Sequence, residues 1–354
     1  MFRKAVLIAF AVSLLFATYS ASYAAGPIKL KVAGYHPPGH MVSTLLAKYC
    51  QEVNKRSGGR LELTPYPAGT LLSPTKMAAG VSVGIADIGF SHVSYTRGRF
   101  PVTEIMELPL GMPSSWIATH VANDFYAKFK PKEWDQYHVL LFTTSPVNVI
   151  QTVSKPIRTL EDFKGLKIRG TGKSGDIVKA LGAVPMPIET PDLYDAIKRG
   201  VVDGAYLTME TYKGFRTGEL FKYNTESWKV GSVYAFYVVM NKNKYNSLPN
   251  DLKKVFDDVS KSFIEEFAVG FNNIDIEGLD FFLKKGGKTF ALSDAESARW
   301  VKAVQPVIAD YKKDMISKGF KPAEVDGWLK FVKERTDYWK AQEKARKIKT
   351  PFQY

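Results

Sequence analysis

Residues 167–175, KIRGTGKSG, hold the side chains whose types and spacing most clearly suggest chemistry. A short strand is predicted to end at Arg169, and Gly170, Gly172 and Gly175 follow in the pattern G-x-G-x-x-G. Such glycines let a backbone approach a dinucleotide pyrophosphate closely. The same segment also resembles the end of a phosphate loop. A third possibility is an arginine placed beside a turn to bind another anion.

The phosphate-loop interpretation fails on spacing. That loop needs a glycine five residues before its Gly-Lys pair, and Lys167 stands at that position. The dinucleotide pattern does fit locally, and Glu189 lies about 20 residues after the strand, where an acidic residue would contact a ribose. However, the helix predicted to start near Ser174 is short, and the unit lies in the middle of the chain. The dinucleotide interpretation is therefore weak.

An anion site at Arg169 requires fewer sequence features than a nucleotide site does. A guanidinium is planar and permanently charged, and it can bind a carboxylate through two parallel hydrogen bonds. The helix after the glycines would direct its N-terminal amides toward the same space. The competing interpretation is that Arg169 pairs with an internal acid such as Glu210. The residues alone leave these two alternatives open.

The elements that must position this arginine alternate between strand and helix. Residues 28–92 read as β-α-β-α-β, and a second α/β unit follows from about residue 139. This alternation predicts largely parallel sheets with helices on their faces. The run VYAFYVVMNK (233–242) is strongly β-like and is expected to return to the first unit, and long amphipathic helices follow residue 249. Ligands of open α/β sheets bind beyond the carboxyl ends of the strands, which for two facing sheets is the cleft between the lobes.

We therefore predict an α/β, two-lobed, periplasmic-binding-protein-like fold, with mixed, mostly parallel sheets and long C-terminal helices that bridge the lobes. The predicted parts are a signal peptide at 1–24, a first lobe from 25–149 plus about 240–278, and a second lobe with the C-terminal helices from 150–239 plus about 279–354.

The N-terminus predicts export to the periplasm. Arg3 and Lys4 precede the apolar run AVLIAFAVSLLFA, and small residues before Ala25 complete a secretory signal. Export also separates the protein from cytoplasmic nicotinamide cofactors. A single cysteine, Cys50, cannot form an internal disulfide, and its apolar helical surroundings predict a buried, inert thiol.

A formal charge of +14 is compatible with anionic ligands, and the lysines are scattered along helix faces, so nucleic acid is not the expected partner. No set of residues with metal-ligand spacing and no G-x-S-x-G or Ser-His-Asp arrangement stands out, so we expect neither a metal nor a cofactor nor an enzyme.

Further candidate ligand contacts follow predicted strands. They are Tyr35, His36 and His40 after the first strand; Ser91 and His92 after the third; Thr208, Glu210 and Tyr212 after AYLTM; and Tyr234 and Phe236 on the returning strand. Each has a structural alternative. Histidines can cap helices or occupy turns, Glu210 can orient Arg169, and aromatic side chains at period two usually face a core.

The chain also resembles the extracytoplasmic solute receptors of TRAP transporters, the DctP-type substrate-binding proteins. The resemblance is carried, in order, by GYHPPGH, SGGRLELTPYPAGTL, GIADIGF, GRFPVTEIMELPL, KPIRTLEDFKGLKIRG, LGAVPMPIETPDLYDAIKRGVVDGAY and VVMNKNKYNSLPNDLKKVF, and it covers nearly all of the mature chain. It implies two lobes that close on an organic acid and deliver it to a membrane pair driven by an ion gradient. The family motif G-[LM]-K-[IL]-R occurs here as GLKIR, which implies that Arg169 binds the carboxylate.

The sequence departs from the sialic-acid members of that family. They carry VDGQENP, with an asparagine that contacts the ligand, whereas this chain has VDGAYLTME with Leu207 at that place. They also have a second arginine ahead of the KPI segment, which this chain lacks. Sialic acid is therefore not the expected ligand. A monocarboxylate, a keto or hydroxy acid, an aromatic acid and a C4-dicarboxylate all remain open.

The resemblance implies the large and small TRAP membrane subunits as partners of a monomeric receptor. An alternative is a receptor that presents its ligand to a membrane sensor kinase, because its sequence would look the same.

Overall fold

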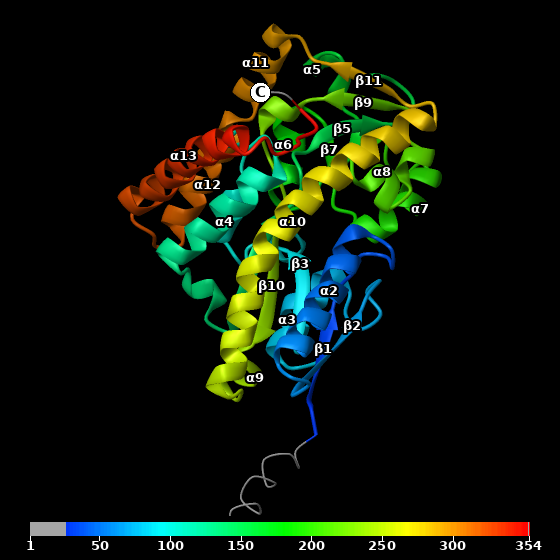
Figure 1. The fold of residues 1–354 in the computed structure, drawn as a ribbon. Coiled ribbons are helices and arrows are strands. Elements are labelled where there is room, and N and C mark those ends of the chain that lie inside the picture. The colour runs from blue at the N-terminus through cyan, green and yellow to red at the C-terminus, as the bar shows by residue number, and fades with distance from the viewer. Residues whose placement is uncertain (1–25, 353) are drawn as a thin grey trace, which may run out of the picture.

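The computed structural model describes residues 26–352 and 354, so the predicted signal peptide at 1–24 lies outside the described residues. Within these residues, no helix combines the length and apolarity that crossing a membrane requires. Two mixed sheets form the framework, with helices on their faces (Figure 1). The predicted α/β class with two sheets is confirmed.

The first sheet has the strand order β2-β1-β3-β10-β4. Its strands are β1 (Ile28–Ala33), β2 (Leu61–Tyr66), β3 (Ile88–His92), β4 (Tyr137–Thr144) and β10 (Ala235–Asn241). The first three strands pair in parallel, whereas β10 is antiparallel to both β3 and β4. Its helices are α2 (Met41–Arg56), α3 (Met77–Ser82), α4 (Ser115–Phe129) and α9 (Lys242–Asn246).

The second sheet has the order β11-β9-β5-β8-β6-β7. Its strands are β5 (Val149–Thr152), β6 (Lys167–Arg169), β7 (Val184–Met186), β8 (Gly204–Leu207), β9 (Tyr223–Glu226) and β11 (Lys288–Ala291). Strand β6 is parallel to β7 and β8, so residues that follow these three strands gather at one edge. Its helices are α5 (Leu160–Phe163), α6 (Gly172–Ala180), α7 (Leu193–Lys198) and α8 (Thr211–Gly214).

The last third of the chain is mostly helical and connects the two sheets. Its helices are α10 (Asn250–Lys284), α11 (Asp294–Ala303), α12 (Gln305–Ser317) and α13 (Pro322–Ala345). Helix α10 packs against α2, α4 and β4 of the first sheet and against α8 and β11 of the second. Figure 1 shows it in yellow, running diagonally past both sheets, with α13 beside α4 and α12 beside α13.

Amphipathic spacing explains how the helices attach. Helix α2 buries Val42, Leu46, Cys50 and Val53, whose positions repeat every three or four residues. As predicted, Cys50 is buried, and burial raises the pKa of its thiol to about 12. The thiol is therefore protonated at neutral pH and unreactive.

The predicted segment boundaries differ from the sheets at two places. Val149, which we predicted to lie in the first lobe, begins β5 of the second sheet. Residues 235–239, which we predicted to lie in the second lobe, are part of β10 in the first sheet. The antiparallel partners β3 and β4 on either side of β10 hold it there. The division of the chain into two rigid lobes stays a prediction.

Candidate functional site

Arg169 is the last residue of β6, at the edge of the second sheet that faces the first, and it is fully buried. Its Nε donates to the carbonyl oxygen of Ile188 at 2.9 Å, and its Nη2 donates to the hydroxyl of Thr190 at 3.1 Å. Its Nη1 donates to the hydroxyl of Tyr234 at 2.8 Å. Tyr234 directly precedes β10, so the guanidinium is held by both sheets.

Among the described residues, the guanidinium of Arg169 has unused hydrogen-bond donors and no acidic partner. An arginine side chain offers five N–H groups, and the three bonds leave one N–H on Nη1 and one on Nη2 without a partner among residues 26–352 and 354. Within the same residues, Arg169 forms no ion pair. Glu210, the internal acid we considered, instead bonds Nε2 of His40 through its Oε2 at 2.9 Å. The interpretation of an internal Arg169–Glu210 pair is therefore wrong.

The glycines after Arg169 serve close packing of backbone segments. A Cβ on Gly170 would lie 3.1 Å from Cα of Gly175, and a Cβ on Gly172 would lie 2.5 Å from Oγ of Ser94. Gly172 also has a φ of +52°, which disfavours other residues. Ser94 belongs to the first sheet's η2 (Val93–Thr96), so Gly172 lets the start of α6 approach the opposite unit. This use of the glycines accounts for the G-x-G-x-x-G pattern without a nucleotide.

A cluster of aromatic rings from the first unit reaches the arginine through Tyr234. His92, the last residue of β3, lies between Tyr95 and Tyr234, with ring centroids 3.6 and 4.9 Å away. Tyr35 stacks on His36 at 4.1 Å and meets Tyr95 edge-on at 5.6 Å. We call the rings of Tyr35, His36, His92, Tyr95, Phe236 and Tyr234 the ring shell. All six are buried.

The two shell histidines are uncharged. Burial lowers the pKa of His92 well below its usual range, and the charge of Arg169 lowers it further. Burial likewise lowers the pKa of His36, with His40 and His92 contributing. The Nδ1 atoms of both residues are buried and have no hydrogen-bond partner among the described residues. Such orphaned nitrogens are rare and costly, and they call for an explanation.

Two of the sequence candidates, Ser91 and Tyr212, point elsewhere. Ser91 is opposite Tyr237 in the sheet register and donates its hydroxyl to the carbonyl of Pro74, on the other side of β3 from His92. Tyr212 stacks on Phe282 at 4.3 Å and donates to Asn224. These contacts give Ser91 and Tyr212 structural roles.

The remaining candidates lie at the edge of the shell. His40 stacks near His36, with centroids 4.5 Å apart, and its Nδ1 accepts from the amide of Val42 as an N-cap of α2. Thr208 donates to Glu210 at 3.3 Å. Phe236 packs on His92 at 5.4 Å and on Phe271 of α10 at 5.4 Å. Its packing role is thus present, and its role as a ligand contact stays a prediction.

Sequence reasoning missed Thr190, Ser174 and Tyr95. The hydroxyl of Tyr95 donates to Oγ1 of Thr190 at 2.9 Å and accepts from its amide at 2.8 Å, and Ser174 bonds the hydroxyl of Tyr234 at 2.5 Å. Thr190 follows β7, the neighbour of β6, so its place after a parallel strand was an available signal. Tyr95 and Ser174, in contrast, each bond a residue of the opposite unit. A local sequence pattern does not indicate such pairs.

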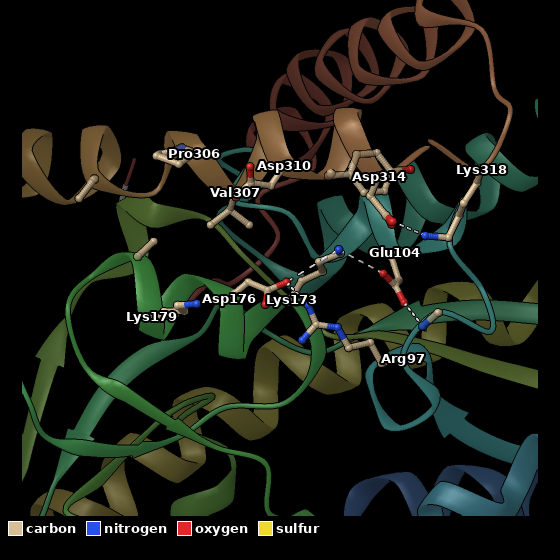
Figure 2. Close-up of a pocket in the computed structure, with 14 residues that line it drawn as sticks. Arg97, Glu104, Lys173, Asp176, Lys179, Pro306, Val307, Asp310, Asp314 and Lys318 are labelled. Carbon is tan, nitrogen blue, oxygen red and sulfur yellow. Dashed lines mark hydrogen bonds and ion pairs between the residues drawn. The ribbon is translucent and has the colours of Figure 1, made fainter. Parts of the chain in front are cut away.

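Ion pairs also join the two facing edges. Arg97, just after η2, contacts both carboxylate oxygens of Asp176 on α6 at 2.8 and 2.9 Å. The buried Lys173, also on α6, lies 3.3 Å from Glu104 of η3 (Thr103–Glu107). Figure 2 shows these pairs on the wall of a pocket of about 600 Å³, with α12 on its other side. The cations Arg97 and Lys173 are already paired there, so this pocket is a weaker anion site than Arg169.

The described residues contain no group of three or more His, Cys, Asp or Glu side chains placed to hold a metal ion. The groups gathered around Arg169 are one guanidinium, hydroxyls and uncharged rings.

Comparison with known proteins decides the family. The profile of the bacterial extracellular solute-binding proteins, family 7, known as DctP, matches residues 32–314. The chain belongs to this family. A solute-binding protein of Albidiferax ferrireducens is 26% identical to this DctP-family chain over 271 residues, which cover 74% of this chain and 78% of the relative.

Solved structures agree with the assignment to the DctP family. A TRAP periplasmic solute-binding protein from Desulfovibrio salexigens, in an open complex, is 32% identical with a TM-score of 0.77, over 89% of this chain and 97% of that one. A TRAP solute-binding protein from Rhodoferax ferrireducens, in complex with copurified benzoate, is 26% identical with a TM-score of 0.82, over 88% and 98%. This confirms the predicted resemblance to TRAP solute receptors.

Proposed function

We propose that this protein captures a small organic acid outside the cytoplasm and delivers it to the large and small membrane subunits of a TRAP transporter. The observation that carries the proposal is Arg169, a buried guanidinium with no counter-charge among the described residues and two N–H groups to spare. A buried charge is costly unless it is paired, so an anionic ligand would supply the missing partner.

The contacts around Arg169 support a mechanism of closure. The ligand carboxylate binds Arg169 of the second sheet, and rotation of the two units toward each other then brings up Tyr234, Tyr95 and the ring shell of the first sheet. Each charge-assisted hydrogen bond would contribute about 1.5–3 kcal/mol in this dry setting. The Rhodoferax relative holds benzoate, which supports an acid as the ligand class here.

Isothermal titration with a panel of organic acids tests the role of Arg169, after unfolding and refolding to remove any acid bound during expression. Arg169→Ala and Arg169→Lys should each weaken binding of the tightest acid at least tenfold, which is about 1.4 kcal/mol. Arg158→Ala, at an exposed arginine of the same unit, is the matched control. An unchanged dissociation constant in both Arg169 variants would refute the role.

Delivery to a transporter is tested separately. Genes for TRAP membrane subunits beside this gene, and acid uptake that stops when this gene is deleted, support transport. A sensor-kinase gene alone, with uptake unaffected by the deletion, would instead support the presentation of ligand to a kinase.

A further inference from the structure

We propose that the acid bound at Arg169 is a small aromatic monocarboxylate that carries a hydroxyl group, and that His92 is the residue that recognises this hydroxyl. This inference rests on the proposed function and specifies the ligand class. It draws on the ring shell, the charges at its two ends and the unpartnered histidine nitrogens.

The first step concerns the number of carboxylates. At one end of the shell is Arg169, and at the other end is Glu210, held by His40 at 2.9 Å. Tyr35 lies between them, because its ring is 4.1 Å from His36 on the side of His40 and 6.5 Å from His92 on the side of Tyr234 and Arg169. His36 and His92 are uncharged. A second carboxylate on the ligand would therefore meet neutral rings or a negative charge, which disfavours dicarboxylates.

The second step concerns the body of the ligand. The rings of Tyr35, Tyr95, His92 and Phe236 lie within 3.6–6.5 Å of their neighbours in the shell. An acid held by Arg169 beside Tyr234 would therefore have aromatic side chains as its neighbours on the side of the first sheet. Aromatic pairs in stacked or edge-on geometry gain affinity beyond what the buried area alone provides. A flat aryl ring fits these walls better than a short flexible chain does.

The third step concerns the hydroxyl. His92 is 2% exposed, and its Nδ1 has no hydrogen-bond partner among the described residues. The ring lies between Tyr95 and Tyr234, and Tyr234 itself bonds Arg169. A hydroxyl can both donate and accept, so it satisfies this nitrogen in either tautomer of the neutral imidazole. An acid without a polar group on its ring would leave the nitrogen unpaired.

The test is isothermal titration of the refolded protein with benzoate, the three hydroxybenzoate isomers, cyclohexanecarboxylate, pyruvate and succinate. At least one hydroxybenzoate should bind about 5-fold or more tightly than benzoate, benzoate should bind more tightly than cyclohexanecarboxylate, and succinate should be about 100-fold weaker than the best aryl acid. His92→Phe keeps an aromatic ring and should abolish the preference for the hydroxyl, so that the ratio of the hydroxybenzoate and benzoate dissociation constants approaches one.

Ser91→Ala is the matched control, because Ser91 is the neighbour of His92 on β3 but faces away from the shell. A hydroxyl preference that persists in His92→Phe would overturn the role of His92. Tighter binding of pyruvate or succinate than of any aryl acid, lost in Arg169→Lys, would overturn the aromatic inference while supporting the proposed function. Failure of every acid to bind folded protein would contradict both.

Discussion

The hydroxyl of Tyr234 accepts a hydrogen bond from Nη1 of Arg169 at 2.8 Å, although the two residues belong to different sheets. The tyrosine ring also lies 5.4 Å from the guanidinium carbon. This pair links the arginine that would bind the anion to the start of β10 in the opposite sheet. Binding of an acid and the approach of the two sheets are therefore expected to be coupled.

Tyr234→Phe should weaken binding of the tightest acid by about 3- to 10-fold, because one hydrogen bond to a charged partner is lost while the ring remains. Titration calorimetry measures the change. Tyr206→Phe is a control, since it removes another buried hydroxyl, one bonded to Ser232, without touching the guanidinium. Equal losses in both variants would mean that the effect is a general loss of packing.

Gly172→Ala should lower acid affinity, because its Cβ would meet Oγ of Ser94 at 2.5 Å across the interface between the sheets. Left-handed backbone adds a cost of about 1–2 kcal/mol for any residue other than glycine. Gly200→Ala measures the backbone cost alone, because Gly200 has a φ of +68° and an added Cβ there would have nothing within 4 Å. Melting temperature and affinity should both fall in Gly172→Ala, whereas Gly200→Ala should lose melting temperature alone.

Asp176→Asn should favour separation of the two units, because it removes the charge that faces Arg97 and Lys173. The side chain of Arg97 is 61% exposed, so we expect only a two- to threefold loss of affinity, which shrinks as salt is added. Small-angle scattering with and without ligand should show a larger radius for the ligand-free variant. Glu161→Gln breaks the Arg299 pair within the second unit and should change neither measurement.

The buried carboxyl of Glu107 should make the free energy of unfolding depend on pH. Burial raises the pKa of its carboxyl to about 8, against hydrogen bonds from Ser94 and the amide of Ala235 that lower it. The native state therefore holds a proton that the unfolded chain releases above about pH 4.5. The free energy of unfolding contributed by this group falls as pH rises from about 4.5 to about 8.

Glu107→Gln should flatten that decline, because a neutral amide replaces the protonated acid. Urea unfolding of the wild type and of Glu107→Gln, at intervals from pH 5 to pH 8, measures how the free energy of unfolding changes with pH. The variant should lose less stability than the wild type over this range. Parallel curves would show that Glu107 is ionised in the native protein.

The sequence was sufficient for the framework of the fold. Alternating strands and helices predicted two α/β units, and the β-like run at 233–242 predicted a strand that returns to the first, as β10 does. Arg169 was found because a short strand, an arginine and glycines are adjacent in the chain. These signals come from residues adjacent in the chain, so they can be recognised from the sequence alone.

Contacts between the sheets could not be predicted. Glu210 was considered as a partner for Arg169, yet it bonds His40, which is 170 residues away. The alternation of side chains along β3 separates Ser91 from His92, but which of the two faces the site depends on where the second sheet lies. The contact between Thr190 and Tyr95 likewise depends on how the two sheets are placed, which the sequence does not state.

Helix α10 is a single segment of 35 residues, roughly 50 Å long, that touches both sheets. A rod fixed at two places resists relative rotation of its supports and stores elastic energy when they move. If the units open and close, one of the two arrangements must bend this helix or shear it along its neighbours. The stiffness of α10 would then determine how readily the protein releases a bound ligand.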